Sequence, residues 1–169
     1  MLQNLARFDD PILRTPTEVV NLEDFENIRS IIPTMFNIID LTKGIGLAAP
    51  QVKLNKSMFV INIENTRKIF INPHIISVSK YSKTEWEGCL SLMGLELKIA
   101  RPEAINVTWT NEEGHTQVAD LEGLWARCWL HEYDHLQGIL IDDRVSKLAL
   151  DIAKRKLAKK IKQFKDTHK

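Results

Sequence analysis

Residues 122–138 read EGLWARCWLHEYDHLQG and predict a helix at the centre of the fold. Large apolar residues such as Trp129 flank its polar middle and look buried. We expect the helix to run from about Glu122 to Gln137 and to end there, because Gly138 can adopt the left-handed conformation that closes a helix.

This predicted helix carries a metal-binding pattern, His131-Glu132-Tyr133-Asp134-His135. The two histidines are four residues apart, so they lie about 40° apart around the helix and one turn along it, and both imidazoles can reach one cation. Glu132 lies beside them, close enough to act on a metal-bound water without itself binding the metal. The alternative is two ordinary histidines, in the core or on the surface, that happen to share helical spacing.

A catalytic site of this kind needs a third protein ligand and one open position. The third ligands that zinc peptidases commonly use are missing. Glu132 is the last glutamate of the chain, so no later glutamate can bind the metal, and the position six residues after His135 holds Ile141 rather than histidine. Cys128 lies roughly 10 Å along the helix from His135, which is too far for one metal to bridge. Cys89 remains as the candidate, because a thiolate with two imidazoles suits Fe(II), Zn or Ni. An inert buried thiol is the alternative for Cys89.

The rest of the chain predicts an α+β fold, in which antiparallel β-sheets pack around the central helix. No strand–helix–strand alternation is visible, and Asn111-Glu112-Glu113-Gly114 predicts a hairpin loop between the last two strands. The expected strands, rich in β-branched and aromatic residues, are Ser57–Ile63, Lys68–Asn72, Ile75–Ser79, Leu95–Ile99, Ala104–Thr110 and His115–Asp120.

Two further helices flank this predicted core, one before it and one after it. The first is expected from about Leu22 to Thr42, with Lys43-Gly44 as its stop and with a kink or split near Ser30 caused by Pro33. Its apolar face is made of Ile28, Ile31, Ile32, Met35 and Ile39. The last helix is expected from about Ser146, as N-cap, to Phe164.

Length and composition indicate a single domain spanning residues 1–169 in a reducing compartment. The chain has 169 residues, a formal net charge of +1 and two cysteines, which excludes a disulfide scaffold. No apolar stretch is long enough to cross a bilayer and no secretory signal is visible, so we expect no membrane partner. We expect a cytoplasmic location, although a mature organellar chain that has lost its transit peptide would look the same.

Three segments, in order, resemble the three signatures of the peptide deformylase family. They are residues 44–51 (GIGLAAPQ), 87–91 (EGCLS) and 131–135 (HEYDH). The similarity extends to residues 10–14 (DPILR) and 136–138 (LQG), and covers most of residues 5–145. It implies a metal-dependent hydrolase that removes the N-formyl group from the starting methionine of nascent peptides and releases formate.

The resemblance implies that Cys89, His131 and His135 hold the metal, Fe²⁺ in the family, with Zn²⁺, Ni²⁺ or Co²⁺ possible in purified protein. The metal-bound water would be the nucleophile, because the cation lowers its pKa towards neutrality. Glu132 would take its proton and later pass that proton to the leaving amine. The Gln51 amide and the Leu90 backbone N–H would stabilise the developing oxyanion.

Further residues take substrate and supporting roles by the same resemblance. Gly44 and Gly46 would belong to a loop beside the substrate, where Gly46 contacts the peptide backbone; a simple turn is the alternative. The methionine pocket would be lined by Ile45, Leu124, Cys128 and His131, for which core packing is the alternative. Glu87 and Arg101 would form an ion pair that orients the metal ligands, or else a plain surface salt bridge.

Three positions depart from the common pattern of the family: Leu130, Met93 and Glu96. Many members have glutamine and proline at the first two, and some carry a peptide-contacting arginine near the third. None of these changes removes a catalytic group. They affect the rim of the substrate cleft and the preference beyond the first residue.

The last predicted helix has a basic surface and an apolar stripe. Residues 147–169 carry nine Lys and Arg against two Asp, a net charge of +7, whereas residues 1–146 carry 14 basic and 20 acidic side chains, a net charge of −6. The stripe consists of Leu150, Ala153, Leu157, Ile161 and Phe164. Such a helix can simply pack on the body, or bind acidic lipid or RNA. The resemblance favours docking on the ribosome near the tunnel exit.

Two other functions fit parts of the sequence. One is a metal-dependent peptidase or amidase that uses the same water, against which the missing third histidine and later glutamate count. The other is an RNA- or ribosome-binding module with a structural metal, which would need a fourth protein ligand.

Overall fold

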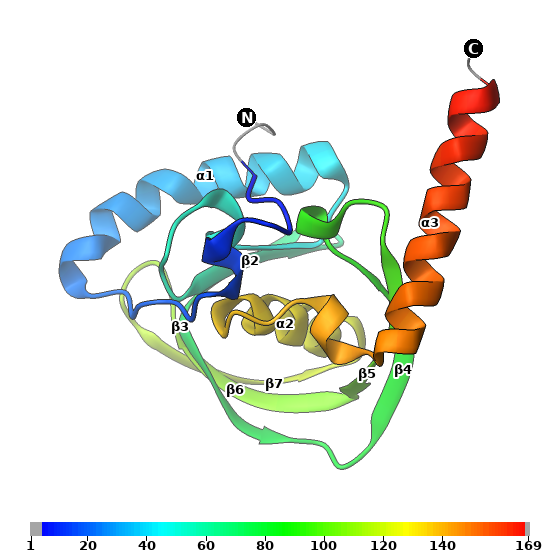
Figure 1. Ribbon diagram of the computed structural model, residues 1–169. Helices are drawn as coiled ribbons and strands as arrows, with labels where there is room; N and C mark the ends of the chain where they lie inside the picture. The colour runs from blue at the N-terminus through cyan, green and yellow to red at the C-terminus, as the bar shows by residue number, and fades with distance from the viewer. Residues whose placement is uncertain (1–4, 168–169) are drawn as a thin grey trace.

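The computed structural model describes residues 5–167, and this part of the chain forms three α-helices and seven β-strands (Figure 1). The helices are α1 (Phe25–Thr42), α2 (Gly123–Leu136) and α3 (Lys147–Thr167). The strands are β1 (Gly46–Ala48), β2 (Met58–Ile63), β3 (Thr66–Val78), β4 (Ser82–Gly88), β5 (Glu96–Pro102), β6 (Ala104–Thr110) and β7 (Thr116–Glu122).

Five strands form one antiparallel sheet in the order β1-β2-β3-β6-β7, and β4 and β5 form a separate two-stranded ribbon. The predicted α+β class is therefore confirmed. Figure 1 shows α2 in the middle of the molecule, with α1 on one side and β6 and β7 on the other. The predicted helix at residues 122–137 and its glycine stop are also confirmed, since Gly138 has a φ of +71° just past α2.

Strand β2 is buried on both faces, because a different helix covers each of them. Phe59 and Ile61 face α2, where Trp129 meets the Phe59 ring edge-on with the centroids 5.5 Å apart. Met58 and Val60 face the other way and pack in the cluster that contains the apolar side of α1. Successive side chains of a strand point to opposite faces, so this strand joins two hydrophobic clusters.

A third cluster ties the β4–β5 ribbon to the last helix. Leu97 and Ile99 of β5 are buried in it together with Cys89. Leu150, Ala153 and Leu157 of α3 pack against this cluster, and the helix then extends past the body (Figure 1). Ser146 accepts a hydrogen bond from the Ala149 N–H at 3.2 Å, which confirms its predicted place as N-cap.

Two predicted interruptions are absent. Pro33 does not split the first helix near Ser30, because it lies on the exposed face of a continuous α1. The two strands expected at residues 68–72 and 75–79 are one strand, β3, whose pairing with β6 shifts register between Ile71 and His74. The Asn72-Pro73 pair therefore marks an irregularity inside a strand rather than a loop.

Strands β1 and β4 were not predicted. Strand β1 has only three residues, and β4 carries mainly exposed polar side chains, so neither shows an apolar pattern. No helix among residues 5–167 is long and apolar enough to cross a membrane.

Candidate metal and active site

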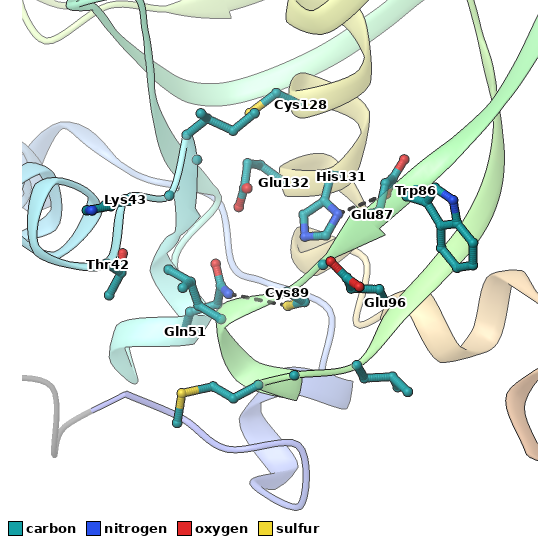
Figure 2. Close-up of a pocket in the computed structure, with 18 of the residues that line it drawn as sticks. Thr42, Lys43, Gln51, Trp86, Glu87, Cys89, Glu96, Cys128, His131 and Glu132 are labelled. Carbon is teal, nitrogen blue, oxygen red and sulfur yellow. Dashed lines mark hydrogen bonds and ion pairs between the residues drawn. The ribbon is translucent and has the colours of Figure 1, made fainter. Parts of the chain in front are cut away.

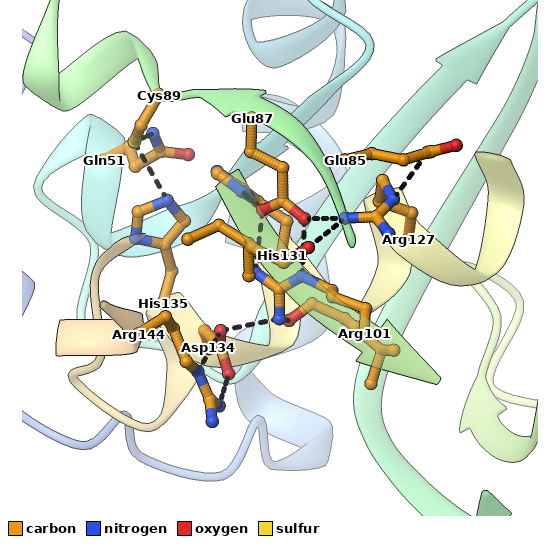
Figure 3. A network of polar contacts seen from close by, with 12 residues as sticks. Gln51, Glu85, Glu87, Cys89, Arg101, Arg127, His131, Asp134, His135 and Arg144 are labelled. Carbon is orange, nitrogen blue, oxygen red and sulfur yellow. Dashed lines mark hydrogen bonds and ion pairs between the residues drawn. The ribbon is translucent and has the colours of Figure 1, made fainter. Parts of the chain in front are cut away.

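Three metal-ligating side chains meet between α2 and the segment that follows β4. The ligand atoms of Cys89, His131 and His135 all lie within 4.8 Å of one another, and the Cys89 Sγ is 3.4 Å from the His135 Nε2 (Figure 3). The helix supplies both imidazoles because four residues make about one turn. The predicted trio is therefore brought together, and one thiol with two imidazoles is a donor set that suits a divalent transition metal.

Burial and hydrogen bonds set the protonation of the two imidazoles differently. Burial lowers the pKa of His135 well below its usual 6.5, so this ring is neutral and free to donate a lone pair. Burial acts the same way on His131, but hydrogen bonds with Cys89 and Glu87 outweigh it and raise the pKa to about 10. In the absence of a cation the His131 ring therefore holds a proton that a metal would displace.

Glu87 orients His131 through one of the two ring nitrogens. Its Oε2 lies 3.0 Å from the His131 Nδ1, which leaves the Nε2 of that ring for a metal (Figure 3). Arg101 binds the same carboxylate through two N–H groups, at 2.8 and 2.9 Å. Burial opposes the charge of Glu87, but the contacts from His131 and Arg101 outweigh it and lower the pKa to about 2. The predicted Glu87–Arg101 pair thus exists and is buried rather than exposed.

The buried network is larger than the sequence suggested. Arg127 binds Glu87 at 2.6 Å, and Arg101 also binds Asp134 at 2.8 Å. Arg144 completes the chain of contacts by pairing with Asp134. Each buried charge of this network therefore faces an opposite charge, which is the condition under which ionised side chains tolerate burial.

Glu132 has a different environment from Glu87. Its side chain is buried next to the metal-ligating residues, and its Oε2 has no hydrogen-bond partner in the described part of the chain (Figure 2). Burial raises the pKa of Glu132 to about 7, an effect that the nearby charges of His131 and Arg101 only partly offset. A carboxyl with this pKa can both accept and release a proton near neutral pH.

Gln51 faces the thiol from the other side of the site. Its Nε2 lies 3.7 Å from the Cys89 Sγ and 3.3 Å from the Ser91 hydroxyl (Figure 2). The side chain is held in place because its Oε1 accepts a hydrogen bond from the Ala48 N–H at 2.8 Å. Leu90, also predicted as a site residue, lines the same cleft. Ser91 was not predicted.

A cleft of about 850 Å³ opens onto the site, and Gln51, Cys89, Leu90, His131 and Glu132 line it. All the predicted substrate residues line it, namely Gly44, Ile45, Gly46, Leu124 and Cys128. Of the three departures from the family pattern, Met93 and Glu96 line the cleft, whereas Leu130, a residue of α2 itself, is buried in the core. The sequence did not indicate that Trp86 of β4 and Leu157 and Lys160 of α3 also line it.

Comparisons with known proteins agree with this geometry. Residues 2–151 match a protein-family model described as polypeptide deformylase. A peptide deformylase from Treponema pallidum (strain Nichols) is 38% identical over 149 residues, covering 88% of this chain and 91% of that protein. The crystal structure of peptide deformylase from Thermotoga maritima matches with a TM-score of 0.81 and 37% identity over 84% of this chain and 96% of that one. A peptide deformylase from Synechococcus elongatus, solved in complex with actinonin, matches with a TM-score of 0.85 and 39% identity over 91% and 85% of the two chains.

Proposed function

The chain belongs to the polypeptide deformylase family, hydrolases that remove the formyl group from the N-terminus of nascent peptides, and we propose that its reaction takes place at Cys89, His131 and His135. The observation that carries this assignment is the convergence of one thiol and two imidazoles within 4.8 Å, at the wall of the cleft that Cys89 and His131 line. The substrate would be an N-formylmethionyl peptide, and the products formate and the free amine.

The three residues fit a divalent metal ion, for which we propose Fe²⁺. The neutral His135 and the Glu87-oriented His131 present ring nitrogens to the same point as the Cys89 sulfur. Zn²⁺, Ni²⁺ and Co²⁺ suit the same donors. When bound, such an ion acts as a Lewis acid that lowers the pKa of water and polarises a carbonyl.

Glu132 would carry the proton of the reaction. Its carboxylate would accept a proton from the attacking water and then donate it to the amine nitrogen as the C–N bond breaks. Amines leave poorly unless they are protonated, so the transfer is needed for the formyl group to depart. A pKa of about 7 supports both halves of this transfer near neutral pH.

Gln51 and Leu90 would stabilise the charge that develops on the formyl oxygen. The Gln51 side-chain N–H and the Leu90 backbone N–H are the two proposed donors, and Ala48 holds the Gln51 amide in position. Removing one such donor typically lowers kcat by about 10²–10³. The methionine side chain would lie against Ile45, Leu124 and Cys128, with Gly46 contacting the peptide backbone.

A ribosomal partner and a cytoplasmic location complete the proposal. Beyond Leu157, α3 presents exposed lysines such as Lys159 and Lys162, and a cationic helix of this kind suits an RNA surface. Both cysteines are free thiols, as in a reducing compartment. Reversing the charge of these two lysines should lower co-sedimentation with ribosomes without lowering turnover of a formyl dipeptide.

The direct test is formate release from formyl-Met-Ala by protein purified without oxygen, with metal content measured in the same samples. Glu132→Gln should lower kcat by about 10²–10⁴ while metal content stays unchanged. The same substitution at the exposed Glu26 is the matched control and should have no effect. Cleavage of unformylated peptides instead, or bound metal with no turnover, would refute the assignment.

A further inference from the structure

The C-terminal helix forms part of the wall of the substrate cleft. Leu157 and Lys160 line the cleft together with Trp86 and Glu96 of the β4–β5 ribbon. The helix is held there by its apolar side, since Leu157 packs on the cluster that contains Cys89. Its position beside the cleft is therefore tied to the packing of the site itself.

One face of the β4–β5 ribbon meets α3 at this end of the cleft. The register pairs Trp86 with Lys98 and Gly88 with Glu96, so Trp86, Lys98 and Glu96 point to the same side of the ribbon. The Lys98 ammonium lies 5.4 Å from the centre of the Trp86 ring, and the Lys156 ammonium of α3 lies 6.0 Å from it. The indole thus lies between cations from two different elements.

The balance of charge here is positive. Lys98 and Lys156 lie over the Trp86 ring, Lys160 and Glu96 line the cleft with that ring, and all four of these charged side chains are exposed. Among residues 5–167 no ion pair within 4.0 Å joins Lys160 to a carboxylate, so its charge is available to a ligand in the cleft. Deeper in the cleft, by contrast, the charge of Arg127 is already balanced by Glu87.

We propose that Trp86, Lys98, Lys156 and Lys160 form an outer subsite that binds an acidic side chain of the peptide downstream of the formylmethionine. This inference rests on the proposed function, because it concerns the same cleft and the same substrate. The indole supplies a flat surface for the aliphatic part of the acidic side chain, and the ammonium groups attract its carboxylate. The contacts are exposed, so the preference is about two- to fivefold at low ionic strength and is weakened by salt.

The test compares formyl-Met pentapeptides that carry Glu, Gln or Lys at each of positions 3, 4 and 5. For the wild-type chain, kcat/KM should be higher for Glu than for Gln, and lowest for Lys, at one or two of these positions. The preference should appear mainly in KM and should shrink in 0.5 M salt. Turnover of formyl-Met-Ala, which is too short to reach the subsite, reports separately on the proposed function.

Lys160→Glu is the decisive variant, and Lys159→Glu is its matched control. Both reverse one charge on neighbouring exposed positions of α3, but only Lys160 lines the cleft. The Glu-to-Gln ratio of kcat/KM should fall to one or below in Lys160→Glu and stay at its wild-type value in Lys159→Glu. Because the ratio is taken within one protein, a general change of activity cancels. Equal ratios in the two variants, or a wild-type ratio of one, would overturn the inference.

Discussion

The carboxylate of Glu132 occupies the space where a side chain at residue 46 would begin. A Cβ built on Gly46 would lie 2.3 Å from the Glu132 Oε1 and 2.8 Å from the Cys128 Sγ. Strand β1 therefore runs directly against the helix that carries the two candidate metal-ligating histidines. The absence of a side chain at Gly46 allows this close approach, and the position of the Glu132 carboxylate depends on that absence.

Gly46→Ala should displace the Glu132 carboxylate, because the new methyl group cannot share its space. We expect kcat for formyl-Met-Ala to fall at least about tenfold and the free energy of unfolding to fall by about 1–3 kcal/mol. Gly44→Ala is the control, since its Cβ would lie 3.4 Å from the nearest atom, the Thr42 Oγ1. Equal effects of the two substitutions on kcat would contradict this explanation.

Arg101→Met should destabilise the chain strongly, because it leaves Glu87 and Asp134 buried with fewer opposite charges. Urea unfolding should show a loss of about 3 kcal/mol, in the range for breaking a buried ion pair. Arg67→Met breaks an exposed pair with Asp40 and should cost less than about 1 kcal/mol. A loss below that level for Arg101→Met would show that the buried network contributes little to stability.

Metal removal should change how many thiols a thiolate-specific reagent can modify at pH 8. Burial raises the pKa of the Cys128 thiol well above its usual 9, and the charge of Glu132 adds to the rise. Cys128 therefore stays protonated and unreactive in the folded chain. We expect no modified thiol with metal bound, one after chelation and two in urea. The thiol modified after chelation should disappear in Cys89→Ser and remain in Cys128→Ser.

The pair between Asp24 and Lys56 should contribute stability that acid removes. The Lys56 ammonium, 2.9 Å away, donates a hydrogen bond that lowers the pKa of Asp24 below its usual 3.8. A lowered pKa stabilises the folded state above the unfolded pKa, and this contribution is lost as the pH falls through the folded value. Urea midpoints of the wild-type chain and Lys56→Met should therefore differ at pH 7 and converge below pH 3. A constant difference across this range would rule out the linkage.

Much of the fold could be predicted because its main elements have clear patterns. Strand β6, for example, alternates buried and half-buried residues over the whole predicted range Ala104–Thr110. Strand β4 could not be found this way, because Lys83, Thr84 and Trp86 are exposed and only its pairing with β5 makes it a strand. The split predicted at Pro33 was wrong for a related reason, since a missing hydrogen bond on the solvent face costs less than splitting a helix whose other face is buried.

The core of the candidate site and the Glu87–Arg101 pair could be predicted from motifs, whereas the rest of the supporting network could not. His131 and His135 are recognisable from their spacing alone. The burial of Arg127 and Asp134, however, depends on partners far along the chain, namely Glu87 and Arg101. The only local indication of this burial was that charged residues of α2 stand next to large apolar residues such as Trp129. The part that α3 plays in the cleft depends on how the helix packs, which no local pattern shows.

The placement of α3 has a consequence for how the enzyme itself is made. A growing chain folds from its N-terminus as it is synthesised. The candidate metal ligands Cys89, His131 and His135 all precede Leu157 and Lys160 in the sequence, so they emerge first. Each copy therefore completes the mouth of its cleft only after the three candidate ligands have been synthesised and have had time to meet.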